Sequence, residues 1–249
     1  MKSHDEKFNE EVSHNISGLG ADIELQTNSC EWINRIATHK YTYNFRWLGR
    51  PIIQLPQDII AMQELIWSIQ PDLIIETGIA HGGSLIFSAS MLELNAACGG
   101  PPDAEVLGID IDIRAHNRVA IEAHPMFKRI TMIEGSSIAP DIIAQVKARA
   151  ADKQRVLVCL DSHHTHDHVL AELQAYAPLV SSGSYCVVFD TVIEDMPAGI
   201  FSDRPWGKGN NPKTAVWEFL RTHDEFTIDK DIENKLLITV APDGYLRRA

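Results

Sequence analysis

LIIETGIAHGGS, residues 73–84, is a short apolar run followed at once by a glycine-rich turn, and this stretch decides the fold class. The apolar run predicts a buried strand, and the pattern over residues 83–94 predicts a helix directly after the turn. Glycines in such a turn let backbone amides approach a ligand at the N-terminus of a helix. Because Gly78, Gly82 and Gly83 do not follow the GxGxxG spacing, a dinucleotide is the less favoured ligand. The turn alone also fits a purely structural role.

Similar units recur along the chain and predict a parallel sheet. Five nearly continuous apolar runs alternate with helical patterns: LIIE (73–76), VLGID (106–110), RITMIE (129–134), VLVCLD (156–161) and YCVVFD (185–190). Strands of this kind are buried on both faces, which indicates helices on both sides of the sheet. FTIDK (226–230) and KLLITV (235–240) follow, and their short separation predicts an antiparallel hairpin. We therefore expect an α/β fold with a mostly parallel, seven-stranded sheet and a C-terminal antiparallel hairpin.

Composition limits the classes of partner. The chain has 249 residues, which suits one large α/β domain, and a formal net charge of -12. Such an acidic chain lacks the positive field that holds phosphate backbones, so nucleic acid is not an expected partner. No apolar run approaches transmembrane length, and the polar N-terminus does not resemble a secretory signal. Cys159 and Cys186 lie in apolar runs, so we expect buried free thiols and a reducing, cytoplasmic location.

The N-terminal part is predicted to differ from the rest. Residues 1–25 lack periodicity, so residues 1–40 are expected to form a polar arm or helix, and residues 41–249 the single domain. The aromatic segment YTYNFRW (41–47) fits either a loop packed on the core or a lid over a ligand. We expect this segment and the loop over residues 191–211 to wall the ligand pocket, because such loops set specificity.

Three acids end predicted strands. Asp110 ends the second strand, where an acid can accept hydrogen bonds from the ribose hydroxyls of an adenosine. Asp161 and Asp190 end the fourth and fifth strands, which are neighbours at one edge of a parallel sheet. Two converging carboxylates repel unless a cation lies between them, and oxygen ligands suit Mg²⁺ or a similar hard ion. Each acid alone would also fit a helix cap or a solvated strand end.

DSHHTHDH, residues 161–168, contains four histidines. His164 and His168 are four residues apart, which predicts one helical face. With Asp161 they fit a two-histidine, one-carboxylate iron site of a hydroxylase. Alternatively, His164 is a general base beside the metal and takes the proton of a substrate hydroxyl.

Taken together, these segments resemble the cephalosporin hydroxylase / rhamnosyl O-methyltransferase family over roughly residues 41–248. The resemblance rests on WLGRPIIQLPQD, IIETGIAHGGSL, GIDIDIR, LDSHHTHDHVLAEL, GSYCVVFDT and PDGYLRR. It implies a Rossmann-like class I methyltransferase fold that binds S-adenosylmethionine and Mg²⁺, a small-molecule hydroxyl acceptor such as a sugar or natural product, and a homo-oligomer. A wider similarity to metal-dependent catechol-type O-methyltransferases implies the individual roles.

On that similarity, Glu76, Gly78 and Ser84 match the methionine-binding turn, Asp110 the ribose acid, and Ser136 the adenine-side loop. His81, Gly82 and Gly83 complete the predicted cofactor-binding turn, and Asp161 contacts both cofactor and metal. Asp161, Asp190 and Thr191 occupy the metal-ligand positions, and His164 stands at the position of the base.

The sequence departs from the family at one position of the metal site. The family carries Glu-Asp at the end of the fifth strand, where this chain has Phe189-Asp190. The departure leaves room for a third function class, a catalytically silent scaffold, beside the methyltransferase and the iron hydroxylase.

Overall fold

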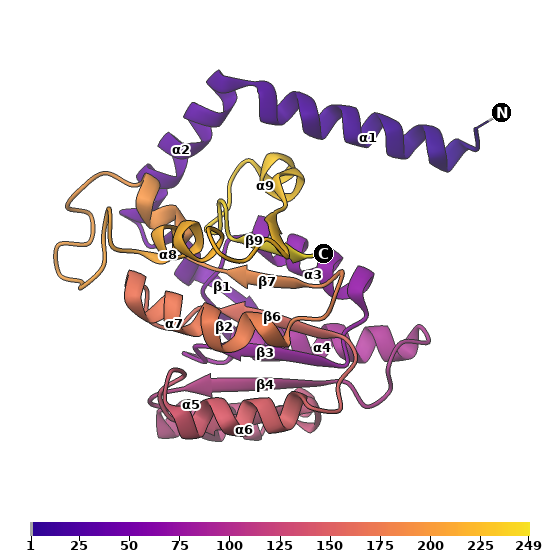
Figure 1. Cartoon of the computed structure of the whole chain (residues 1–249), viewed down its shortest axis with the longest axis vertical. Helices are drawn as coiled ribbons and strands as arrows, with labels where there is room; N and C mark the ends of the chain where they lie inside the picture. Colours follow the sequence, from indigo (N-terminus) through magenta and orange to yellow (C-terminus); the bar gives the residue numbers. More distant parts are fainter. Residues whose placement is uncertain (1) are drawn as a thin grey trace.

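In the computed structural model, which describes residues 2–249, seven strands form one sheet in the order β5-β4-β3-β6-β7-β9-β8. Figure 1 labels the central strands of this sheet, β4, β3, β6, β7 and β9. The strands are β3 (Leu73–Thr77), β4 (Glu105–Asp110), β5 (Ile130–Glu134), β6 (Val156–Leu160), β7 (Tyr185–Val188), β8 (Phe226–Ile228) and β9 (Tyr245–Arg248). β3 to β7 pair in parallel, while β9 is antiparallel to both of its neighbours. The five predicted parallel strands and the predicted fold class are confirmed.

Helices cover both faces of the sheet, as the continuously apolar strands predicted. One face packs against α3 (Pro56–Ile69), α4 (Gly83–Ala97), α5 (Ala115–Glu122) and α9 (Lys230–Leu236), the other against α6 (Pro140–Ala150), α7 (His166–Tyr176) and α8 (Pro212–Phe219). Along β3, Ile74 points into the first layer and Leu73 and Ile75 into the second. Because side chains alternate across a strand, both layers are apolar only when the whole strand is apolar.

The C-terminal antiparallel pair uses a different second strand from the predicted one. β8 pairs with β9, so that Thr227 lies opposite Arg247, and the predicted strand 235–240 is absent. Residues before it form α9, and Leu237, with φ 58°, ends that helix. The backbone after α9 is hydrogen-bonded to α3: Val240 N donates to the buried Asp58 carboxylate over 2.9 Å. These residues are apolar because they pack on the core, so their composition resembled that of a strand.

Two helices form the N-terminal part. α1 (His4–Ala21) projects from the body of the molecule, has no buried residue and approaches the body at α9 (Figure 1). It begins at Ser3, whose side chain forms a capping box with Glu6. α2 (Ile23–Ala37) runs back to the domain and buries Ser29 and Ile33. The segment is therefore helical, and its second helix is part of the packed structure.

Two smaller features complete the fold. η1 (Tyr41–Asn44) leads into a two-stranded antiparallel ribbon of β1 (Phe45–Trp47) and β2 (Arg50–Ile52). The short helices η2 (Pro125–Arg129), η3 (Ala177–Leu179) and η4 (Thr191–Asp195) lie in connections. All four cysteines are free, and Cys159 and Cys186 are buried as expected. Within residues 2–249, no helix combines the length and apolarity needed to cross a membrane.

Candidate active site

The turn after β3 is held by close backbone packing. Gly78 has φ 92°, and its N–H donates to Ile109 O over 2.8 Å. A Cβ at Gly78 would lie 2.0 Å from the carbonyl oxygen of Asp161, so only glycine fits. The glycine therefore brings the turn directly against the segment that follows β6.

Glu76 lies beneath this turn and is 3% exposed. Ser84, in the first turn of α4, donates a hydrogen bond to Glu76 Oε1. Burial raises the pKa of Glu76 to about 7, against the opposing effect of that hydrogen bond. A buried carboxyl with this pKa is suited to receive a cationic ligand group, because a positive charge would favour its ionised form.

Glu76 should make the fold less stable at higher pH. Its folded-state pKa is raised from 4.5 to about 7, so its contribution to stability is complete below pH 4.5 and is lost as pH rises through 7. Glu76→Gln does not titrate, so its free energy of unfolding should gain about 2–3 kcal/mol relative to the parent between pH 5 and pH 8. Urea unfolding at both pH values measures this. If the difference in free energy of unfolding between Glu76→Gln and the parent were the same at pH 5 and pH 8, the raised pKa of Glu76 would be contradicted.

Asp110 supports the same turn from β4. Its Oδ2 accepts from Ile79 N (2.8 Å) and Ala80 N (3.2 Å), and its Oδ1 accepts from Asp112 N (3.0 Å). The sequence suggested the ribose role but not this support of the turn. Gly78, His81, Gly83 and Ser84 line a cavity at the ends of β6 and β7, whereas Gly82, Asp110 and Ser136 do not.

A cavity of about 540 Å³ lies where β6 and β7 end. Its lining includes Tyr41, Thr42 and Tyr43, and also Ile200, Phe201 and Trp206. Residues from both segments predicted to wall the pocket, 41–47 and 191–211, therefore line this cavity. α2 also contributes, through Ile33, Ile36 and Ala37, so the N-terminal segment has a place in the site that the sequence did not reveal.

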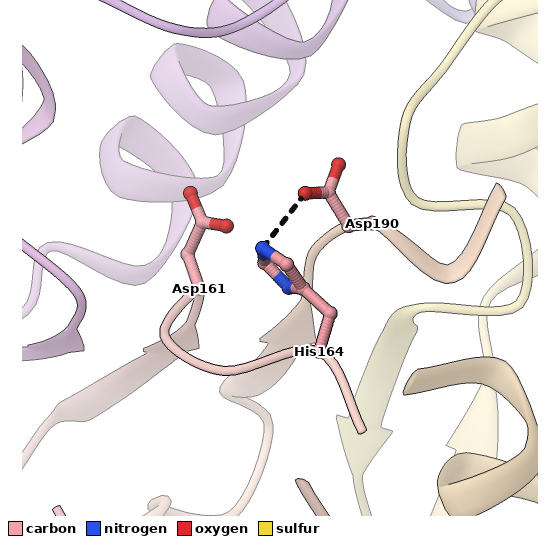
Figure 2. A group of neighbouring side chains, drawn as sticks. All are labelled: Asp161, His164 and Asp190. Carbon is pink, nitrogen blue, oxygen red and sulfur yellow. Dashed lines mark ion pairs between the residues drawn. The ribbon is translucent and has the colours of Figure 1, made fainter. Parts of the chain in front are cut away.

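Asp161, His164 and Asp190 converge in this cavity (Figure 2). One potential ligand atom from each lies within 4.8 Å of the others, and His164 Nε2 is 3.2 Å from Asp190 Oδ2. Burial, and then the charge of Asp190, raises the pKa of Asp161 well above its usual range. A divalent cation between these groups would relieve that repulsion, and carboxylate oxygens with an imidazole nitrogen can bind one. The predicted pairing of Asp161 with Asp190 therefore has a geometry that suits a metal.

Two other predicted residues lie elsewhere. Thr191 is fully buried, and its hydroxyl donates to Pro242 O over 2.6 Å. His168 Nε2 lies 3.1 Å from Ser162 Oγ and 3.2 Å from Ser137 Oγ, outside the Asp161–His164–Asp190 group. α7 begins only at His166, so His164 precedes the helix and shares no helical face with His168. The prediction that they share a helical face was therefore wrong, and His168 does not join Asp161 and His164 in one group of possible ligands.

Trp206 is a wall residue that the sequence analysis did not single out. Its ring meets the His164 imidazole edge-on, with centroids 4.9 Å apart and planes at 89°. Arg204 places its guanidinium 5.4 Å from the centre of the same indole. A tryptophan within a stretch rich in Pro and Gly was the available signal, since such loops seldom bury large aromatics without a partner.

Comparison with known families now identifies the chain. The family model described as Rhamnosyl O-methyltransferase/CmcI matches residues 39–249. The chain belongs to this family. The family is one of S-adenosylmethionine-dependent O-methyltransferases, as the sequence motifs suggested.

Relatives within the rhamnosyl O-methyltransferase/CmcI family match most of the chain. The rhamnosyl O-methyltransferase of Mycobacterium tuberculosis is 32% identical over 222 residues, covering 84% of this chain and 83% of the relative. That of Mycobacterium leprae is 30% identical over 219 residues, with 84% and 88% covered. A solved CmcI structure with magnesium and S-adenosylmethionine has a TM-score of 0.57 at 18% identity, covering 83% of this chain and 77% of CmcI. The structural likeness shows the shared fold.

The departure from the family at Phe189 has a clear structural basis. Phe189 is 4% exposed and belongs to the core layer that contains Ile52 and Tyr245. Its N–H donates to Leu160 O over 2.9 Å, so the backbone continues the pairing of β6 and β7. Phe189 therefore supplies packing at the position where the resemblance led us to expect a carboxylate, and the possible metal ligands found together are Asp161, His164 and Asp190.

Proposed function

We propose that this family member transfers the methyl group of S-adenosylmethionine to a hydroxyl of a small molecule, with a divalent metal and a histidine base. The observation that carries the proposal is the convergence of Asp161, His164 and Asp190 (Figure 2) in a cavity that residues of the glycine-rich turn also line. The turn suits the cofactor, and the three side chains suit activation of an acceptor hydroxyl.

The cofactor would lie across the carboxyl ends of the parallel strands. Its methionine end would meet the turn of Glu76, Gly78 and Ser84, together with His81, Gly82 and Gly83. Asp110 would accept the ribose hydroxyls, since each carboxylate oxygen has lone-pair capacity beyond the turn amides. Ser136, after β5, would lie on the adenine side. Asp161 would face both the cofactor and the metal.

The reaction would be an in-line displacement at the methyl carbon, with S-adenosylhomocysteine leaving as the new C–O bond forms. Mg²⁺ or a similar divalent ion, held by Asp161 and Asp190, would lower the pKa of the acceptor hydroxyl when bound. His164 would take the hydroxyl proton at the ring nitrogen that does not face Asp190, and Asp190, whose Oδ2 lies 3.2 Å from Nε2, would stabilise the imidazolium. Thr191 is not among the proposed ligands, because its hydroxyl donates to Pro242 O.

Two other functions have less support. An iron hydroxylase built on Asp161, His164 and His168 lacks its third ligand, because His168 is bonded to Ser162 and Ser137. A silent scaffold is suggested only by Phe189, and the other polar groups of the site are in place. We also propose a cytoplasmic location, consistent with four free cysteines, a homo-oligomeric assembly, and a division between residues 1–40 and 41–249.

Transfer of a labelled methyl group tests the proposal. Parent protein, methyl-labelled S-adenosylmethionine and Mg²⁺ are incubated with glycosides, including rhamnosides, and with phenolic natural products. We expect label in an ether linkage on one class of acceptor, because the relatives act on a rhamnosyl hydroxyl. An oxygenated product that requires Fe²⁺ and O₂ would overturn the proposal.

Asp110→Ala should weaken S-adenosylmethionine binding by at least roughly 10-fold, the equivalent of one hydrogen bond to a charged acceptor. The change removes charged acceptors for two ribose hydroxyls, each worth roughly 1.5–3 kcal/mol at most, and also frees the amides of Ile79 and Ala80. Calorimetric titration of variant and parent measures the ratio. Equal affinities would remove Asp110 from the ribose site while leaving the fold assignment intact.

A further inference from the structure

A polar cluster lies behind the active site, and no step above uses it. At its centre is Glu172 on α7, which is fully buried. Its Oε1 accepts from Ser162 Oγ over 2.6 Å, while its Oε2 has no hydrogen-bond partner in the described protein. A buried carboxylate is costly unless it is paired, so its retention calls for a role.

His168, one helical turn earlier, is the partner within reach. Its Nε2 lies 3.5 Å from Glu172 Oε1 and 3.1 Å from Ser162 Oγ. One proton arrangement links these groups: Nε2–H is shared between Ser162 Oγ and Ser137 Oγ, and the Ser162 hydroxyl donates to Glu172 Oε1. The imidazole, the hydroxyl and the carboxylate therefore form one directed chain of hydrogen bonds.

The same imidazole also reaches a second loop. His168 Nε2 lies 3.2 Å from Ser137 Oγ, in the loop after β5, and Tyr176 donates its hydroxyl proton to Ser137 O. Ser162, in contrast, belongs to the loop after β6, follows Asp161 directly and lines the cavity. α7 thus holds two loops of the sheet edge through one histidine.

We propose that His168 and Glu172 are positioning residues that fix the adenine-side loop relative to the loop of Asp161. This inference rests on the proposed function, which places the adenosine end of the cofactor beside Ser136. Neither side chain touches the reacting atoms. Their effect is transmitted through Ser137 and Ser162, whose spacing sets the width of the adenosine-binding part of the site.

The role has a consequence that separates it from a merely structural one. The loop of Asp161 is packed against Gly78, so a change in the spacing moves the loop of Ser137. This movement affects the adenosine part of the cofactor and not the methionine part. Removal of the His168 or Ser137 side chain should therefore weaken the binding of free adenosine and the binding of S-adenosylhomocysteine by the same factor. Ser84→Ala, at the methionine end, should weaken S-adenosylhomocysteine but not adenosine.

The experiment measures the dissociation constants of adenosine and S-adenosylhomocysteine, with the melting temperature recorded in parallel. The variants are Ser137→Ala, His168→Gln and Glu172→Gln, of which the first removes a single hydroxyl and should fold. The control is His166→Ala, because His166 lies on the first turn of α7 but bonds to Thr214 and pairs with Glu218. Since a hydrogen bond contributes a net 0.5–1.5 kcal/mol, each loss should weaken both ligands by roughly 3- to 10-fold.

Glu172→Gln keeps an acceptor for Ser162 but removes the charge, so it should show a smaller loss than His168→Gln. The proposal is overturned if the melting temperature falls in these variants while both dissociation constants stay at the parent values. It is also overturned if adenosine binding is unchanged and only S-adenosylhomocysteine weakens. Failure of the parent to bind either ligand is a different result, because it refutes the proposed function itself.

Discussion

Replacement of His164 by alanine should reduce turnover by roughly 10²–10⁴-fold, the usual contribution of a general base. Affinity for S-adenosylmethionine should stay close to that of the parent, because the glycine-rich turn and Asp110 are separate from the imidazole. Part of the lost activity should return as pH rises, since hydroxide can then remove the acceptor proton. Steady-state turnover across a pH series, on an acceptor found by methyl transfer, measures both effects.

His163→Ala is the matched control for this variant. His163 lies on the same loop, is exposed and bonds through Nδ1 to Thr165 Oγ1 at 3.0 Å. Its ring also meets that of Trp206, with centroids 5.5 Å apart, so its removal disturbs the packing of that wall without removing the base. Turnover should therefore fall by far less than in His164→Ala. A turnover in His164→Ala equal to that of His163→Ala would exclude His164 as the base.

Loss of either carboxylate should have the second large effect, on metal binding. Asp161→Asn and Asp190→Asn keep the shape of the side chain but remove one anionic ligand each. Each substitution should weaken Mn²⁺ binding by at least 10–100-fold, because loss of even an outer-shell partner of a metal ligand costs roughly that much affinity. Electron paramagnetic resonance of Mn²⁺ measures the affinity. Asp161→Asn should also stabilise the metal-free protein, because it removes a buried charge that Asp190 repels.

Asp112→Asn is the control for the carboxylate variants. Asp112 also follows a strand end, but its side chain is 71% exposed and its nearest cation is Arg114 at 3.9 Å. Its Mn²⁺ affinity should equal that of the parent. If Asp161→Asn and Asp190→Asn also retained the affinity of the parent, the metal site would have to lie elsewhere.

Local sequence patterns predicted the parts of the fold that local chemistry determines. The five parallel strands were recognised because burial on both faces demands continuous apolar runs. The convergence of Asp161 and Asp190 followed from topology, since β6 and β7 are neighbours and parallel. Their approach needed no knowledge of side-chain packing.

Long-range contacts account for the errors. Residues 235–240 are as apolar as a strand, but the amide of Val240 bonds to Asp58, 182 positions earlier in the chain. Thr191 follows Asp190 directly, yet its hydroxyl donates a hydrogen bond to the carbonyl oxygen of Pro242. His168 has helical spacing from His164, but the helix starts between them. α2 lines the cavity through tertiary packing that no pattern in residues 23–37 encodes.

Calorimetric titration of the parent with S-adenosylmethionine, with and without Mg²⁺, tests the central claim most directly, since it needs no known acceptor. We predict saturable binding at one site per chain, with S-adenosylhomocysteine competing for the same site and NADH producing no binding heat. Absence of heat with S-adenosylmethionine, or tight binding of NADH in its place, would contradict the assignment of this cavity to methyl transfer.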